Sequence, residues 1–228
     1  MLTVEKLSLS DSLLRWWKKN GRMYPWRETT DPYLVLVAEV MLHRTRADQV
    51  LPVYETFVKR FPDISSLANA SREDILKILR PLGLKWRIDL LQEMALKIVH
   101  ETGGKIIPDK DWLKSLPGVS EYIASAVMCF AFKKPEPLLD TNTVRIIGRL
   151  YNIPVNDSSR RSKKFKKIYA DLMDAERARE FNMAMIDLGA MVCKARLPLC
   201  ENCPLRNHCR YYINHKVGGC AKSLFPIW

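Results

Sequence analysis

The sequence contains no apolar run that approaches the ~18 residues needed for a membrane-spanning helix. Its N-terminal segment lacks the charged start, the apolar stretch and the small-residue cleavage site of a secretory signal. Internal repeats and low-complexity segments are also missing. With 47% hydrophobic residues among 228, the chain is long enough to bury a substantial core. We therefore expect a folded, soluble and intracellular protein with no membrane association.

Patterns typical of β-strands are scarce, because no segment alternates clearly between apolar and polar residues and no Asn-Gly hairpin occurs. Instead, apolar residues recur at spacings of three and four, as in residues 74–83. Helix starts are indicated by Asp31, which precedes a proline, and by Ser71, which precedes an acidic first turn. We expect Ser10 to cap a helix that ends at Asn20. The fold should be almost entirely α-helical, with further helices at about 109–115, 120–132, 141–151, 161–174 and 177–192.

Acidic residues are outnumbered, since 25 Asp and Glu stand against 37 Lys and Arg and give a formal net charge of +12. A surplus this large on a small folded chain favours a polyanionic partner, most often a nucleic acid. Basic surfaces also serve solubility alone, so the charge by itself does not separate the two interpretations. The basic stretch 160–167 likewise suits either a solvated helix face or contact with a DNA backbone.

Six cysteines occur, and four of them are closely spaced as Cys193-x6-Cys200-x2-Cys203-x5-Cys209. In an intracellular chain such a cluster predicts a metal site before it predicts disulfides. Thiolates are soft ligands, and four of them bind either zinc or a [4Fe–4S] cluster. Structural zinc usually takes two Cys-x2-Cys pairs, and only one such pair is present, so the spacing favours iron–sulfur.

This spacing resembles the cluster loop of the endonuclease III and MutY group, within the helix-hairpin-helix superfamily of DNA glycosylases. Residues 181–205, FNMAMIDLGAMVCKARLPLCENCPL, are similar to the helix and loop that carry the cluster there. The resemblance extends from Tyr24 to Cys209, nearly the whole chain. It implies a mainly structural [4Fe–4S] cluster that presents basic residues to DNA, here Lys194, Arg196, Arg206 and Arg210.

The resemblance also implies two all-α lobes. A six-helix barrel is expected over residues 23–134, with the helix-hairpin-helix at about 109–132. A cluster lobe is expected to combine residues 1–22 with 135–228, with the cluster loop at 193–209. The implied partner is double-stranded DNA that contains a mismatched or damaged base, bound by a monomer. The implied location is the cytoplasm with the nucleoid, or the nucleus if the source is eukaryotic.

Residues 116–120, LPGVS, separate two helical segments by a proline, which fixes φ, and a glycine, which permits a positive φ. Alone, this pattern also fits an ordinary turn between helices. LPGVSEYIASAV resembles the hairpin of the superfamily, in which N–H groups at the start of the second helix bind a DNA phosphate. The resemblance implies that Gly118 and Ser120 contact DNA. Ser120 stands where the family usually has a second glycine, and serine caps helices well.

Asp140 resembles the catalytic aspartate of the superfamily, and it equally suits the role of a helix N-cap. The roles are compatible, because a helix N-terminus stabilises a negative charge. Departure of a base builds positive charge on the sugar, which a fixed carboxylate stabilises while it orients or activates water.

Glu39 resembles the glutamate that helps protonate the leaving base in MutY-type enzymes. In an apolar helix, Glu39 also suits a pairing with a buried basic or backbone group.

Tyr122 stands where the lyases of the superfamily carry a lysine nucleophile. Lysine forms a Schiff base with the sugar and goes on to cut the strand, which tyrosine cannot do. The resemblance therefore implies a monofunctional glycosylase that leaves an abasic site. Tyr122 itself suits either contact with the target base or packing between helices.

Two loops are similar to those of thymine glycosylases that act on G·T mismatches. Residues 43–45, HRT, resemble an insertion loop in which Arg44, beside Thr45, fills the gap left by the flipped nucleotide. Arg44 also suits a simple phosphate contact. Because the sequence ends soon after the cluster loop, we expect no counterpart of the C-terminal domain by which MutY reads 8-oxoguanine. Residues 83–87, GLKWR, resemble the wedge loop, which implies DNA contacts by Leu84, Lys85 and Arg87.

The leading hypothesis is the removal of thymine or uracil mispaired with guanine, after the base has been flipped out of the duplex. The nearest alternative is a MutY-like adenine glycosylase that acts on A·G or A·8-oxoguanine pairs. An alternative from another class is a non-catalytic DNA-binding protein that retains the cluster as a scaffold. Replacement of Asp140 by asparagine distinguishes the enzyme from the non-catalytic protein. In an enzyme, this substitution should abolish excision while largely preserving DNA binding.

Overall fold

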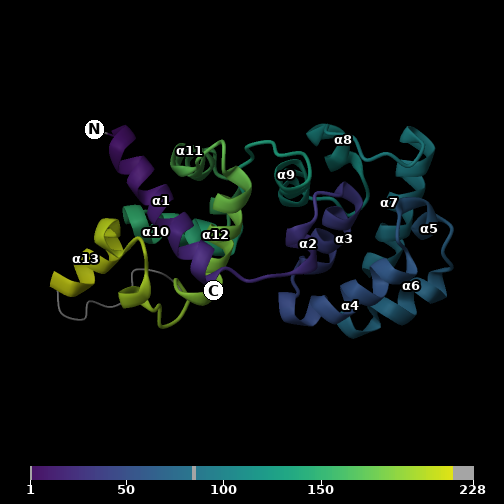
Figure 1. Cartoon of the computed structure of the whole chain (residues 1–228), viewed down its shortest axis with the longest axis horizontal. Helices are drawn as coiled ribbons and strands as arrows, with labels where there is room; N and C mark the ends of the chain where they lie inside the picture. Colours follow the sequence, from purple (N-terminus) through teal and green to yellow (C-terminus); the bar gives the residue numbers. More distant parts are fainter. Residues whose placement is uncertain (1, 84–85, 218–228) are drawn as a thin grey trace. The chain divides into compact units, whose positions relative to one another are not determined.

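The computed structural model describes residues 2–83 and 86–217, with side chains described for 9–83 and 88–215. Every regular element in these ranges is a helix and none is a strand (Figure 1), which confirms the all-α prediction. Within the same ranges, no helix is both long and apolar enough to span a bilayer.

The chain divides into two compact units. We call Met23–Lys134 the central unit, and Met1–Arg22 together with Pro135–Trp228 the terminal unit. The helices of the central unit are α2 (Pro25–Glu28), α3 (Pro32–Leu42), α4 (Ala47–Arg60), α5 (Ile64–Ala68), α6 (Arg72–Leu79), the 3₁₀ helix η1 (Arg80–Leu82), α7 (Trp86–Thr102), α8 (Lys110–Ser115) and α9 (Glu121–Phe130).

The terminal unit is built from the two ends of the sequence (Figure 1). Its helices are α1 (Leu2–Asn20), α10 (Thr141–Tyr151), η2 (Ser159–Arg161), α11 (Lys163–Leu172), α12 (Ala178–Met191), η3 (Cys200–Asn202), η4 (Arg206–His208) and α13 (Arg210–Val217).

Helix α3 forms the centre of the central unit, where it packs against α4 and α9. Its sequence, PYLVLVAEVML, is apolar on almost every face, and a helix of this kind must be buried on all sides. The start of α3 is fixed as predicted, because the Asp31 carboxylate accepts hydrogen bonds from the backbone N–H groups of Tyr33 and Leu34 at 2.8 and 3.1 Å. Pro32 occupies the first turn, where a missing N–H costs nothing.

Helix α12 holds the terminal unit together, since α1 and α10 both pack against it. The fully buried Asp187 of α12 accepts hydrogen bonds from Trp17 Nε1 at 3.0 Å and from Arg22 Nε at 2.7 Å, which ties the N-terminal segment to this helix. Gly189 permits a close approach of α10, because a Cβ added there would lie 2.5 Å from the Cβ of Asn142. The beginning of α10 is therefore fixed against α12.

The predicted helix starts are confirmed at Ser71, whose Oγ accepts from the N–H of Asp74 at 3.1 Å, and wrong at Ser10. Helix α1 begins at Leu2, so Ser10 lies in its interior and is buried. Leu9 and Leu13, one turn apart and both buried, continue the apolar face past Ser10. This apolar face outweighs the capping preference of serine.

Candidate active site and cysteine loop

Asp140 is the N-cap of α10, which is the structural one of the two roles suggested for it, beside that of the catalytic aspartate. Its Oδ1 accepts a hydrogen bond from the N–H of Thr143 at 2.7 Å, while its own N–H donates to Thr143 Oγ1 at 2.8 Å. Its Oδ2 accepts from Asn142 Nδ2 at 3.0 Å. The carboxylate is half-buried, held by one donor on each oxygen, and stabilised by the helix N-terminus.

A chain of hydrogen bonds leads from Asp140 to the first cysteine of the loop. Asn142 Oδ1 accepts from Arg145 Nη2 at 2.8 Å, and Arg145 Nε donates to the carbonyl oxygen of Cys193 at 2.9 Å. Burial lowers the pKa of the Arg145 guanidinium, and the nearby charge of Arg149 acts in the same direction. The residues next to Asp140 are thus coupled to the start of the cysteine loop through polar contacts.

The four predicted metal ligands lie on one loop region after α12, with Cys193 at its start and Cys209 just before α13. All four are partly buried. Burial raises the pKa of the Cys203 thiol to about 12, and the proximity of the other three cysteines contributes to the same increase. The four thiols therefore share one electrostatic environment.

Arg149 of α10 is the main support of this loop. It is only 5% exposed, and its Nη1 donates to Cys193 Sγ at 3.3 Å and to the carbonyl oxygen of Lys194 at 2.7 Å. Its Nη2 donates to the carbonyl oxygen of Ala195 at 2.9 Å, and its guanidinium carbon lies 5.0 Å from the centre of the Tyr211 ring. Burial raises the pKa of the Cys200 thiol, and the nearby charge of Arg149 opposes this rise.

The chemistry of this donor set can be tested against the two metals that the sequence left open. Among the described residues, no three His, Cys, Asp or Glu side chains are grouped so that they could hold a single metal ion. Zinc draws all its ligands to about 2.3 Å from one centre, whereas a [4Fe–4S] cluster takes one thiolate at each of its irons. In number and kind, the four thiols match the ligands of a [4Fe–4S] cluster and equally those of a structural zinc.

Glu39 lies in the central unit, in α3, and is only 7% exposed. It belongs to the helix that packs against α9, which carries Tyr122. The Tyr122 side chain is half-buried in the first turn of α9. The structure thus places the two predicted side chains on neighbouring helices of one unit, whereas Asp140 belongs to the other unit.

The predicted hairpin lies between α8 and α9. Gly118 has φ +77°, the left-handed conformation that its turn requires. Ser120 caps α9 as predicted, because its Oγ accepts from the N–H of Ile123 at 3.3 Å. Glu121 forms ion pairs with Lys110 at 2.9 Å and Lys114 at 3.6 Å, which link the two helices. Gly118 and Ser120 are both exposed, as a contact with DNA would require.

Arg44 occupies the loop between α3 and α4 with φ +64°, a conformation that L-residues rarely adopt. It is exposed, whereas the neighbouring Thr45 is half-buried and its N–H donates to the carbonyl oxygen of Leu42 at 3.1 Å. Of the predicted wedge-loop residues, Leu84 and Lys85 lie outside the described residues. Arg87 belongs to α7, but its side chain also lies outside them.

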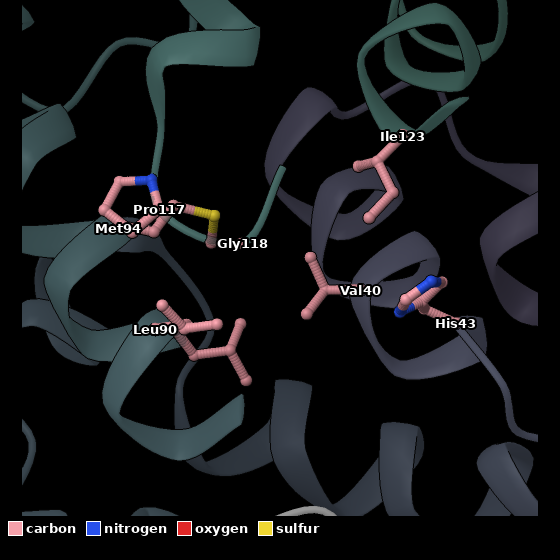
Figure 2. Close-up of a pocket in the computed structure, with 8 residues that line it drawn as sticks. Val40, His43, Leu90, Met94, Pro117, Gly118 and Ile123 are labelled. Atoms are coloured by element: carbon pink, nitrogen blue, oxygen red, sulfur yellow. The ribbon is translucent and has the colours of Figure 1, made fainter. Parts of the chain in front are cut away.

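A small apolar hollow lies in the central unit, between α3, α7, α9 and the hairpin (Figure 2). It has a volume of about 270 Å³ including its open mouth. Sequence reasoning missed this hollow, because its walls come from four segments that no motif connects. It is lined by Val40, His43, Leu90, Leu91, Met94, Pro117, Gly118 and Ile123.

The comparison with family models decides the class of the protein. The HhH-GPD superfamily of base excision DNA repair proteins matches residues 37–171, which include the hairpin and Asp140. The chain belongs to this superfamily. The prediction made from the cysteine spacing and the hairpin is therefore confirmed at the level of the family.

Similar proteins cover nearly the whole of this HhH-GPD protein. A thymine-DNA glycosylase of Aeropyrum pernix is 40% identical over 214 residues, which are 91% of this chain and 95% of that protein. A thymine/uracil-DNA glycosylase of Pyrobaculum aerophilum is 39% identical over 217 residues, which are 92% and 94% of the two chains. The solved structure of a thermostable thymine-DNA glycosylase superposes with a TM-score of 0.87 at 30% identity, over 93% of this chain and 98% of that one.

Proposed function

We propose that this HhH-GPD protein is a monofunctional DNA glycosylase that hydrolyses the N-glycosidic bond of thymine or uracil mispaired with guanine. The observation that carries the choice of base is its similarity, over more than nine-tenths of the chain, to proteins named thymine and thymine/uracil-DNA glycosylases. Its substrate is double-stranded DNA, from which the base is flipped before the reaction. A monomer is sufficient, because one chain carries all the proposed catalytic residues.

Asp140 is proposed to act on the sugar. As the bond between the sugar and the base breaks, its electron pair leaves with the base and the sugar acquires oxocarbenium-like positive charge. Each oxygen of the Asp140 carboxylate accepts one described hydrogen bond, which leaves lone pairs that can face the sugar or a water molecule. The carboxylate stabilises the cation and accepts a proton from the water that adds to it.

Glu39, which is only 7% exposed, is proposed to donate a proton to the leaving base, as its similarity to the glutamate of MutY-type enzymes implies. Tyr122 has no amine, so no Schiff base forms at this position and water is the nucleophile. The product is an abasic site in an intact strand. The absence of a covalent adduct after borohydride treatment would agree with this role, and an efficiently trapped adduct would contradict it.

The remaining predicted contacts are proposed to hold the bent duplex. The exposed hairpin at Gly118 and Ser120 suits a phosphate, because the first N–H groups of a helix such as α9 have no carbonyl partner within the helix. Arg44 is exposed in a strained conformation, which suits a side chain that enters the gap left by the flipped base. The similarity of residues 43–45 and 83–87 to the insertion and wedge loops of thymine glycosylases extends this proposal to Thr45, Leu84, Lys85 and Arg87.

The four thiols are proposed to hold a [4Fe–4S] cluster, with Cys193, Cys200, Cys203 and Cys209 each bound to one iron. When bound, the cluster supplies the covalent links that keep residues 193–209 folded. The support comes from the shared environment of the thiols and from the Arg149 side chain that donates to Cys193 Sγ. The glycosidic bond is broken by the carboxylates alone.

The test is a panel of duplexes that contain G·T, G·U, A·G or A·8-oxoguanine pairs, assayed by strand cleavage with alkali. We expect cleavage at thymine and uracil, and a preference for the two adenine duplexes would overturn the choice of base. Asp140→Asn should reduce excision by at least about a thousandfold while DNA binding changes little. Excision by this variant at the parental rate would refute the mechanism, and binding without excision by the parent would favour a non-catalytic protein.

A further inference from the structure

The tip of the cysteine loop exposes an apolar side chain without an evident structural reason. Leu197 is 88% exposed, and Leu199 is 45% exposed. Leu197 also has φ +49°, in the left-handed region that leucine strongly disfavours. A leucine on the surface is common and requires no explanation by itself. Leu197, however, destabilises the folded chain in two ways, by exposing its apolar side chain to water and by holding a backbone conformation that leucine disfavours.

The strain is imposed by anchors on both sides of the tip. On one side, Arg149 donates to the carbonyl oxygens of Lys194 and Ala195 at 2.7 and 2.9 Å. On the other side, the N–H of Leu199 donates to the carbonyl oxygen of Val192 at 2.9 Å. The segment between these anchors is short and closed, so that Leu197 is presented in a defined place rather than at the end of a loose loop.

The charges around the tip identify the kind of partner. Lys194 and Arg196 are exposed, and neither forms an ion pair with a described residue. The only acidic side chain in the sequence from 193 to 209 is Glu201, which accepts hydrogen bonds from Arg206 at 3.4 Å and from Tyr212 at 2.9 Å. The tip is therefore an apolar side chain flanked by two cations, which is complementary to a polyanion.

We propose that Leu197 packs against the deoxyriboses of the DNA minor groove, between two phosphates that Lys194 and Arg196 contact. Minor-groove proteins likewise bring single apolar side chains into the groove while their cations bind the adjacent backbone. Two leucines are too few for the apolar core of a stable protein interface, which buries about 1,200–2,000 Å² in total. The inference rests on the proposed function for the presence of DNA, but it does not depend on which base is removed.

The test measures binding of the full chain to an undamaged duplex by fluorescence anisotropy over a range of salt concentrations. We expect both Leu197→Ala and Leu197→Gly to weaken binding about tenfold, from the loss of apolar contact. The slope of log K against log salt should not change in either variant, because no charge is removed. Arg196→Gln should instead reduce this slope by about 0.9. Leu96→Ala, which removes a leucine that is 51% exposed in α7, is the matched control and should bind as the parent does.

Thermal unfolding separates the proposed contact from a structural role. Leu197→Gly should unfold at the same temperature as the parent or higher, because glycine adopts a positive φ without strain. Parental binding by this variant would overturn the proposal, as would a loss of binding that is matched by a loss of stability. Parental DNA binding combined with a lost protein contact would assign Leu197 to a protein partner instead. If the parent fails to excise any base while the leucine variants still bind DNA more weakly, the proposed function fails and this inference stands.

Discussion

At the scale of single residues, the groups that carry the proposed chemistry could be found from the sequence, whereas those that position them could not. Asp140 was identified by resemblance, and its two suggested roles both rely on its place at the start of α10. Arg145 and Arg149 were not identified, although they stand one turn apart in the same helix. Their function depends on carbonyl groups more than forty positions away in the sequence, which no local pattern encodes.

Gly189 provides a test of how closely α10 must be held. An alanine there would bring its Cβ within 2.5 Å of the Cβ of Asn142, whose amide donates to Asp140. The clash outweighs the gain of about 1 kcal/mol in helix propensity, so we expect Gly189→Ala to destabilise the protein by about 1–3 kcal/mol. It should also lower the excision rate of the folded protein, as measured in single-turnover reactions.

The neighbouring Ala190 supplies the control, because it lies in the same helix but is exposed. Ala190→Gly should cost about 1 kcal/mol through helix propensity and leave the single-turnover rate unchanged. If Gly189→Ala loses stability but excises at the parental rate, the approach of α12 to α10 does not position Asp140.

At the scale of elements, helix starts with a side-chain cap were predictable because the capping hydrogen bonds are local. Asp31, Ser71 and Ser120 all cap helices where the sequence suggested. The start of α1 was not predictable from such a signal, since buried apolar residues on both sides of Ser10 continue the helix. The apolar hollow lined by residues of α3, α7 and α9 arises only from packing, and its lining residues share no motif.

Helix α11 allows the ambiguity of the basic stretch to be resolved. Lys163 and Lys164 are exposed at its start. If this face follows the DNA backbone, Lys163→Glu combined with Lys164→Glu should weaken binding and lower the slope of log K against log salt by about 2. An unchanged slope, with circular dichroism equal to that of the parent, would show that the face is only solvated.

At the scale of the whole molecule, the proposed cluster makes a prediction that separates the two units. Cys203→Ser removes one of four thiolates, so the purified protein should lose most of its iron and its absorbance near ~400 nm. Hydrogen exchange should then accelerate in the terminal unit, around residues 193–217, and change little in Met23–Lys134. Cys129→Ala is the control, because Cys129 is buried in α9 of the central unit and should leave the iron content unchanged. Stoichiometric zinc without iron in the parent would refute the cluster, and exchange that accelerates equally in both units would show that its loss unfolds the whole chain.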